Sequence, residues 1–198
     1  MRSFRWFPAL LAAAALAAAP AGAKTFTVDP DHTGVTFQVR HLFTYVDGRF
    51  RTFQGTIEYD PSAPDRTKVR GTIDVTSIDT NVAKRDEHLR SADFFDAGRF
   101  PKIEFVSTGV SDVDRATNSG TLTGNLTMHG VTKPVALRAQ FLGEATDPWG
   151  NKKAGFHAET TINRKDWGLN WNKTVETGGV LVGDEVKIRI DAEGGLEE

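Results

Sequence analysis

The chain has 198 residues, of which 39% are hydrophobic and 25% charged, and its formal net charge is -2. That length suits one domain with a substantial hydrophobic interior. Charges of both signs are interspersed, so the chain lacks the basic stripe that a nucleic-acid partner requires. It contains no cysteine, which excludes disulfide bonds and anchoring through a lipid-modified cysteine.

Residues 1–23 are typical of a secretory signal peptide. Arg2 and Arg5 supply a positively charged end, residues 7–19 an apolar core, and residues 21–23 a cleavage site. The apolar core holds about thirteen residues, too few to cross a hydrocarbon layer of about 30 Å as a helix, and no later segment is long enough. We therefore expect an exported, soluble, periplasmic protein. Its mature chain should form a single domain over residues 24–198 with no integral membrane segment.

Alternation of apolar and polar residues with period two dominates the mature chain. Side chains of a strand point to alternate faces of a sheet, so each such stretch predicts a strand with one apolar face. Short turn signals rich in Asp, Asn, Pro and Gly separate the stretches and favour hairpins of successive strands. We predict an all-β fold, an antiparallel meander closed into a barrel of about eight strands. The apolar faces are formed by Val35, Phe37 and Val39; Ile73 and Val75; Ile103 and Phe105; Leu122, Leu126 and Met128; Val135, Leu137 and Phe141; Phe156 and Ile162; and Val186, Ile188 and Ile190.

One stretch, residues 82–92, breaks the alternation. It has neither glycine nor proline and is rich in helix formers, which predicts a short helical insert between two strands. Thr80 or Asn81 could cap its first turn. Because Phe94 and Phe95 follow it, the insert is well placed to close one end of a barrel.

The contents of the barrel decide its function. A barrel of about eight strands can be filled by its own side chains or can hold one small apolar ligand. Gly71, Gly124, Ala139 and Ala158 remove bulk from the inward faces, as a cavity requires, but large residues of neighbouring strands could equally fill those gaps. The candidate ligand-lining residues are Phe37, Val39, Ile73, Val75, Phe105, Leu126, Met128, Leu137 and Phe141, joined by Phe94 and Phe95.

Arg85, Asp86 and His88 form the densest cluster of polar groups. Arg85 could meet a phosphate or carbonyl head group with paired N–H donors. Alternatively, Arg85 and Asp86 hold the insert to adjacent backbone while His88 caps carbonyls. His41 lies on the same face of its predicted strand as Phe37, the face that points inward. Its imidazole could donate a hydrogen bond to a ligand or to a buried backbone carbonyl.

The remaining histidines give no sign of a metal site. His32, His129 and His157 lack metal-ligand spacing, and there is no cysteine to assist them. We expect neither a metal nor another cofactor.

A series of short motifs runs in order along nearly the whole mature chain. Each is weak alone, but the ordered set resembles the YceI family of exported, lipocalin-like proteins, described as binding polyisoprenoids. The motifs are Asp29, His32 and Phe37 leading to His41; residues 48–55 (Gly-Arg-Phe-x-x-Phe-x-Gly); 77–80; 85–89 (Arg-Asp-x-His-Leu); 93–96 (Asp-Phe-Phe-Asp); 100–105; 124–130; 131–135; 162–164; and 167–169.

The resemblance implies a lipocalin-like barrel whose interior holds a long isoprenoid chain, such as a polyprenyl phosphate or a quinone tail. No catalytic residue set comes with the family. The chain departs from the family pattern at residues 42–45 (Leu-Phe-Thr-Tyr), which are bulkier than the small residues often found there. We expect them to narrow one mouth of the barrel.

Two other functions stay open at this point. A solidly packed barrel could serve as a stress-related or protein-interaction module, with Trp149, Trp167 and Trp171 as its only aromatic contact patch. An enzyme acting on a small lipid is less favoured, because Asp86 and His88 lie two apart on a helix and point in different directions. The barrel ends leave room for a homodimer. Residues 194–198 are expected to form a frayed end.

Overall fold

The structure, a computed structural model, describes residues 22–174 and 180–197, so nearly all of the predicted signal peptide lies outside the described residues. Strands account for most of the described chain, with one α-helix and three short 3-10 helices. The elements are β1 (Lys24–Val28), β2 (Gly34–His41), β3 (Thr44–Phe50), β4 (Phe53–Tyr59), η1 (Pro64–Arg66), β5 (Lys68–Asp74), η2 (Val75–Ser77), β6 (Ile78–Asp79), α1 (Ala83–Arg90), β7 (Lys102–Asp114), β8 (Ser119–Met128), β9 (Val131–Thr146), β10 (Lys152–Asn163), η3 (Arg164–Trp167) and β11 (Val182–Leu196).

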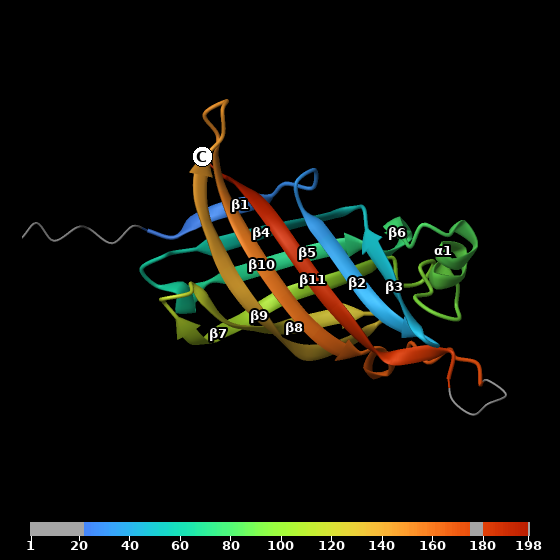
Figure 1. Cartoon of the computed structure of the whole chain (residues 1–198). Helices are drawn as coiled ribbons and strands as arrows, with labels where there is room; N and C mark the ends of the chain where they lie inside the picture. The colour runs from blue at the N-terminus through green and yellow to red at the C-terminus, as the bar shows by residue number, and fades with distance from the viewer. Residues whose placement is uncertain (1–21, 175–179, 198) are drawn as a thin grey trace, which may run out of the picture.

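The strands form one sheet that closes on itself (Figure 1). Around the ring the order is β1, β4, β5, β7, β8, β9, β10 and β11, and the ring closes because β1 pairs with the end of β11. The first part of β11 pairs with β2, which pairs with β3, and β6 extends that edge. All these pairings are antiparallel. The predicted all-β, antiparallel, lipocalin-like barrel of about eight strands is confirmed.

The period-two pattern sets the register of the barrel wall. Phe105 of β7 lies opposite Leu126 of β8, and Phe37 of β2 lies opposite Ile188 of β11. In each pair both side chains belong to the predicted apolar face. A slip by one residue would turn the whole apolar set of a strand toward water, so burial of one face fixes the pairing.

The predicted helical insert is present as α1, which lies at one end of the barrel beside β6 (Figure 1). The residue that precedes its first turn is Val82, whose side chain makes no capping hydrogen bond. The predicted capping role of Thr80 or Asn81 is therefore wrong. Instead the Asp86 carboxylate reaches back from the first turn and accepts hydrogen bonds from the Thr80 backbone N–H and hydroxyl.

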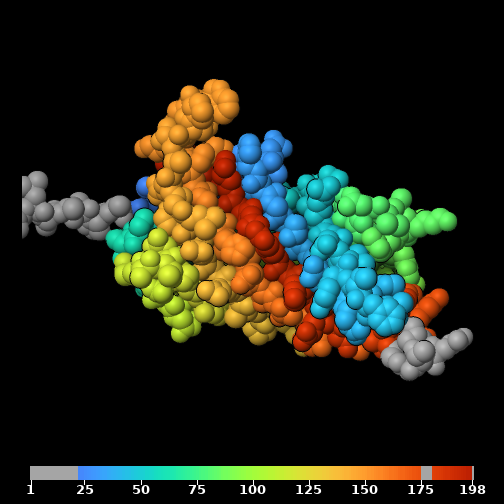
Figure 2. Space-filling model, in the orientation of Figure 1, coloured from blue at the N-terminus to red at the C-terminus, as the bar shows by residue number. Residues whose placement is uncertain are grey.

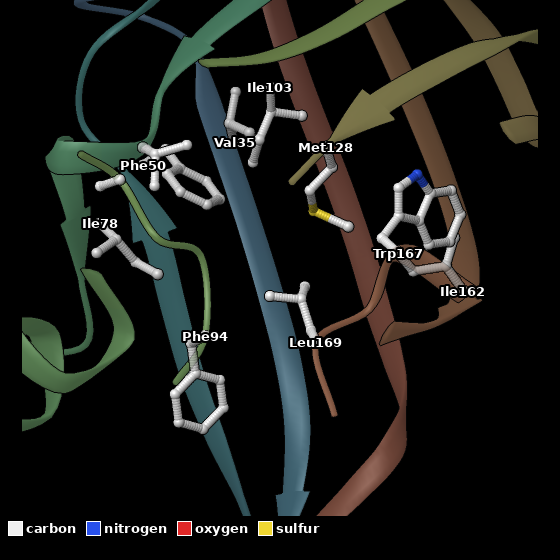
Figure 3. Close-up of a cluster of buried hydrophobic side chains, with 11 residues drawn as sticks. Val35, Phe50, Ile78, Phe94, Ile103, Met128, Ile162, Trp167 and Leu169 are labelled. Carbon is white, nitrogen blue, oxygen red and sulfur yellow. The ribbon is translucent and has the colours of Figure 1, made fainter. Parts of the chain in front are cut away.

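Two clusters of buried side chains occupy the two ends of the interior. The larger cluster joins β2, β3 and the barrel wall to the chain that follows α1 and η3, and Figure 3 shows Trp167, Met128 and Leu169 meeting in it. Its buried members are Val35, Phe50, Val75, Ile78, Phe94, Ala97, Ile103, Met128, Ile162, Trp167 and Leu169. The smaller cluster contains Phe26, Ile57, Tyr59 and Ala154, with Phe141, Phe156 and Leu196 packed against it.

The C-terminal residues correct one expectation. Gly194, Gly195 and Leu196 are not frayed but form the end of β11, opposite Val28, Thr27 and Phe26 of β1. Their pairing with β1 and the packing of Leu196 on the smaller cluster hold them in place, and Glu198 of the expected frayed end lies outside the described residues.

Helices long and apolar enough to cross a bilayer are absent from the part of the chain that the structure describes.

Candidate apolar binding cavity

The inward-facing side chains of the barrel wall are incompletely buried. Phe37, Val39 and Leu126 point inside, yet each keeps part of its surface accessible. In a filled barrel they would be covered, because protein interiors pack as densely as organic crystals. Their accessible surface belongs to a cavity of about 640 Å³, a size typical of small-molecule sites. The interior is therefore hollow rather than filled by the chain's own side chains.

The predicted lining residues converge on this cavity with one exception. Phe37, Val39, His41, Ile73, Arg85, His88, Phe94, Phe95, Phe105, Leu126, Met128, Leu137 and Phe141 all line it. That they contact a ligand stays a prediction. The predicted lining set left out Val186, Ile188 and Ile190 of β11, which also line the cavity. The alternation of these three residues in the sequence could have identified them.

Val75 is the exception. Its side chain is 1% exposed in the larger cluster and does not line the cavity, so its predicted place on the ligand-facing wall is wrong. The strand ends one residue earlier, because the Asp74 carboxylate accepts a hydrogen bond of 2.8 Å from the Thr76 N–H and starts η2. The turn carries Val75 off the wall, where its own N–H donates to the Pro101 carbonyl at 2.9 Å.

The glycines of the barrel wall differ in what occupies the space beside them. A Cβ built on Gly71 would have no atom nearer than 3.9 Å, so this glycine leaves free space at the cavity wall. A Cβ on Gly124 would lie 2.4 Å from the Phe105 ring, and one on Gly48 would lie 2.2 Å from the Phe37 ring. Gly124 and Gly48 thus make room for aromatic rings of neighbouring strands, whereas Gly71 makes room for the cavity.

Arg85 and Asp86 both hold Thr80. The Arg85 guanidinium donates from Nε to the Thr80 hydroxyl and from Nη2 to the Thr80 carbonyl, each at 2.7 Å. With the Asp86 contacts, these bonds fasten α1 to the strand segment before it. Arg85 also lines the cavity, and its Nη1 group is not used in these two bonds. Of the two roles considered for this cluster, the anchoring role is present in the structure.

His88 packs against aromatic neighbours at the α1 end of the barrel. Its ring meets Phe94 and Trp171 edge-on, with centroids 5.0 and 4.8 Å away, and its Nε2 lies 2.8 Å from an Asp93 carboxylate oxygen. His88 thus pairs with a carboxylate rather than capping carbonyls. His41 also lines the cavity, at the end of β2.

Arg164 is a lining residue that sequence reasoning missed as a candidate. Its side chain is 4% exposed, and its guanidinium donates to the carbonyls of Gly183 (2.9 Å), Leu169 and Trp171 (2.9 Å). Burial lowers the pKa of this guanidinium, and the nearby Asp184 carboxylate partly offsets the shift. Arg164 ties the segment after η3 to the start of β11. Its only sequence signal was its place in the motif at residues 162–164.

Aromatic rings line the opposite end of the cavity. Tyr59 stacks on Phe141 with centroids 4.5 Å apart and meets Phe156 edge-on at 5.8 Å. Burial raises the pKa of the Tyr59 hydroxyl above its ordinary value. Outside the rings, the Arg115 guanidinium donates to the carbonyl of Ser62 at 3.2 Å and links two end loops.

A cluster of Asp29, His32 and Glu193 brings three metal-ligating groups within 4.8 Å of one another. The Lys153 ammonium lies 2.8 Å from Asp29 and 3.4 Å from Glu193. Lys153 and then His32 hold the pKa of Asp29 well below its usual range. The carboxylates therefore already share a cation, and the cluster is an ion-pair network between the β1–β2 loop, β10 and β11.

Three of the four tryptophans were considered above as a contact patch, and the structure does not bring them together. Trp167 is buried and donates from Nε1 to the Leu126 carbonyl at 3.1 Å. Trp171 packs against Phe94 at the α1 end, whereas Trp149 is 84% exposed in the β9–β10 hairpin. These positions lie at different ends of the barrel.

The expected narrowing of one mouth by residues 42–45 is also wrong. Phe43 is 97% exposed and Tyr45 54% exposed, and neither lines the cavity. The turn between β2 and β3 holds these side chains away from the barrel interior.

A closed antiparallel barrel around an apolar cavity, with a helix across one end, defines the class of lipocalin-like barrels. A model of the YceI-like domain family matches residues 26–194. A UPF0312 protein of Shewanella baltica is 43% identical over 166 residues, which cover 82% of this chain and 86% of that protein. The chain belongs to the YceI family.

Solved structures share the fold. The YceI protein of Campylobacter jejuni is 30% identical with a TM-score of 0.69, over 80% of this chain and 90% of that chain. A polyisoprenoid binding domain from Saccharophagus degradans is 14% identical with a TM-score of 0.60, over 87% of this chain and 98% of that chain.

Proposed function

We propose that the protein is a periplasmic carrier that holds a long-chain isoprenoid lipid, a polyprenyl phosphate or a quinone-like molecule, inside its barrel. The observation that carries the proposal is the apolar cavity of about 640 Å³. Isoprenoid chains are nearly insoluble in water, and each buried CH₂ contributes about 0.8 kcal/mol. A lined tunnel can therefore retain such a chain without a strong polar contact.

The polar groups of the interior support recognition by shape. Within the described residues, every buried side-chain nitrogen or oxygen has a hydrogen-bond partner. A ligand thus gains little from satisfying an orphaned polar group, and chain length and width would decide which molecule fits. The related fold of a domain that is named for polyisoprenoid binding supports the same ligand class. The periplasmic location rests on the predicted signal peptide.

The contacts at α1 favour a binding protein over an enzyme. Arg85 and Asp86 each hold Thr80, and His88 pairs with Asp93. Groups engaged in anchoring are poorly placed to transfer protons to a ligand. The proposal requires one copy of the chain, and a homodimer stays a prediction from the sequence.

The proposal is tested by extracting the protein with organic solvent after purification from its native host and identifying the extract by mass spectrometry. We expect a prenyl lipid in near-stoichiometric amount. The matched control is the variant Phe105→Glu, which places a carboxylate on the cavity wall, expressed and purified in the same way. A prenyl lipid in both extracts, or in neither, would contradict the proposal.

A further inference from the structure

The turn between β2 and β3 carries large apolar side chains where folding does not call for them. His41 pairs with Thr44, so only Leu42 and Phe43 form the turn. Two-residue hairpin turns favour Asn-Gly, because their central residues need positive φ. Here Leu42 has a φ of 50°, a conformation that bulky side chains rarely adopt. Backbone strain of this kind is found mainly at functional positions.

This turn, the hairpin tip of residues 41–45, has aromatic side chains that face water. Phe43 is 97% exposed, and Tyr45 is 54% exposed beside it. The Leu42 N–H donates to the Leu181 carbonyl at 3.0 Å, which ties the hairpin tip to the start of β11. The aromatic side chains are therefore held outward on a backbone that is fastened to β11 on its β2 side.

Cationic side chains surround the hairpin tip. The Arg40 guanidinium donates to the Leu42 carbonyl at 2.9 Å, and the Lys187 ammonium lies 5.4 Å from the centre of the Tyr45 ring. Lys173 is exposed, and its carbonyl accepts a hydrogen bond from the Leu181 N–H. Aromatic rings flanked by Lys and Arg are typical of segments that lie in the interface of a bilayer.

Acidic residues lie on the same strands, Asp47 level with Lys187 and Asp184 between Val182 and Lys187. Asp47 of β3 accepts a hydrogen bond of 2.9 Å from Gln38, and Asp184 of β11 accepts one of 2.9 Å from Lys165. Glu185 follows Asp184 and is exposed. The charged groups that contact the hairpin tip itself are those of Arg40 and Lys187, at the Leu42 carbonyl and the Tyr45 ring.

We propose that the hairpin tip docks on lipid bilayers that contain anionic lipids, with Phe43 entering the acyl-chain boundary. A protein partner is less well matched, because a stable protein interface buries about 800 Å² per partner, and Phe43 and Tyr45 offer only a small apolar surface. His41, the first residue of the hairpin tip, pairs with Val182, and both line the cavity. Docking would therefore place the α1 end of the barrel next to the membrane.

This docking goes beyond the proposed lipid cargo and does not depend on it, so the two can fail separately. The test uses the mature protein and two sets of vesicles, phosphatidylcholine alone and phosphatidylcholine with phosphatidylglycerol, in a sedimentation assay. We expect binding to the vesicles with phosphatidylglycerol and a decrease with added salt. The variant Phe43→Ser should bind about tenfold more weakly, whereas Phe43→Leu should keep most of the affinity.

The matched control is Trp149→Ser. Trp149 is 84% exposed in the β9–β10 hairpin. This hairpin and the β2–β3 hairpin lie at opposite ends of β11 (Figure 2). This variant should bind vesicles as the parent does, and circular dichroism should show both serine variants folded. The proposal is overturned if the parent does not sediment with either set of vesicles, if Trp149→Ser loses as much binding as Phe43→Ser, or if Phe43 matters only for capture of a protein.

Discussion

Phe26 of β1 lies opposite Leu196 of β11, and this pair of residues joins the two ends of the described chain and completes the barrel. Phe26 is fully buried, and Leu196 packs on the same cluster. The barrel wall therefore depends on a contact between residues from its first and last strands.

Replacing Leu196 with Asp should open this seam. A carboxylate on the smaller cluster loses the apolar contact and is unpaired, and we expect the free energy of unfolding to fall by about 3 kcal/mol. Urea denaturation measures the loss. The control is Leu142→Asp, because Leu142 is exposed on β9 and should tolerate the change. Equal effects of the two substitutions would show that β1 and β11 do not hold the barrel shut.

Replacing Gly71 with Leu should reduce the cavity without breaking the wall. No atom lies within 3.9 Å of a Cβ at this position, so the side chain can enter the free space. Displacing about two CH₂ groups of a ligand should weaken prenyl-lipid binding about tenfold, as measured by titration with a fluorescent prenyl probe.

The control for this substitution is Gly195→Leu. Gly195 also has free space around its Cβ but does not line the cavity. Parent-like binding by Gly71→Leu would mean that the ligand does not occupy this part of the barrel.

Replacing Phe105 with Glu should place an unpaired carboxylate on the apolar wall. We expect a loss of about 3 kcal/mol in stability and loss of prenyl-lipid binding. The neighbouring substitution Val106→Glu is the control, because Val106 faces the other side of β7 and is exposed. Thermal unfolding and lipid titration of both variants test directly whether Phe105 faces the interior. A Phe105→Glu protein with the stability and lipid affinity of the parent would refute this orientation.

Replacing Arg85 with Ala should have two separable effects. Loss of its bonds to Thr80 should lower stability by about 1 to 2 kcal/mol. If its Nη1 group also meets a phosphate, binding of a polyprenyl phosphate should fall more than binding of a quinone.

The control for Arg85 is Arg90→Ala. Arg90 also lies on α1 and donates to a backbone carbonyl, that of Thr76 at 3.1 Å, but it does not line the cavity. Its replacement should lower stability and leave the preference between the two lipids unchanged. Equal losses of the two lipids in Arg85→Ala would leave Arg85 with an anchoring role alone.

The ion-pair network of Asp29, His32 and Lys153 should make stability depend on pH. Asp29 raises the pKa of His32, so the contribution of His32 is complete below its unfolded pKa of about 6.5 and is lost as pH rises through the folded value. The pKa of Asp29 is lowered, first by Lys153. Its contribution is therefore present above its unfolded pKa of about 3.9 and is lost as pH falls through the folded value.

The variant His32→Asn checks this dependence. Its urea midpoint should lie further below that of the parent at about pH 5 than at about pH 8. In the background Asp29→Asn, His32→Asn should have a smaller effect with a weaker pH dependence, because Glu193, 4.0 Å from the ring, still raises the pKa of His32 but by less than Asp29 does. A pH-independent difference in the parent background would disprove the coupling.

The barrel was predictable because its signal is local. Each strand carries its own alternation, and burial of one face on eight adjacent strands admits few arrangements. The end of a strand was less predictable, as Val75 shows, because one Asp74 side-chain bond decides whether the wall continues. The pairing of residues 194–196 with β1 joins distant parts of the chain, and two glycines in a row gave no strand signal.

The hollow interior could not be predicted from the alternation alone. Gly71 and Gly124 look alike in the sequence, yet the Phe105 ring covers one and leaves the other free. That difference depends on the stagger of neighbouring strands and on side-chain rotamers. The same holds for Arg164, because the turn after η3 brings the carbonyls of Leu169 and Trp171 to its guanidinium and the fold adds that of Gly183.

The lining of the cavity has a consequence for timing. Exposed residues of an end loop, Asp114, Arg115 and Asn118, line the cavity beside its buried apolar wall. A guest could therefore enter and leave at this loop, and stiffening the loop would slow uptake and release together.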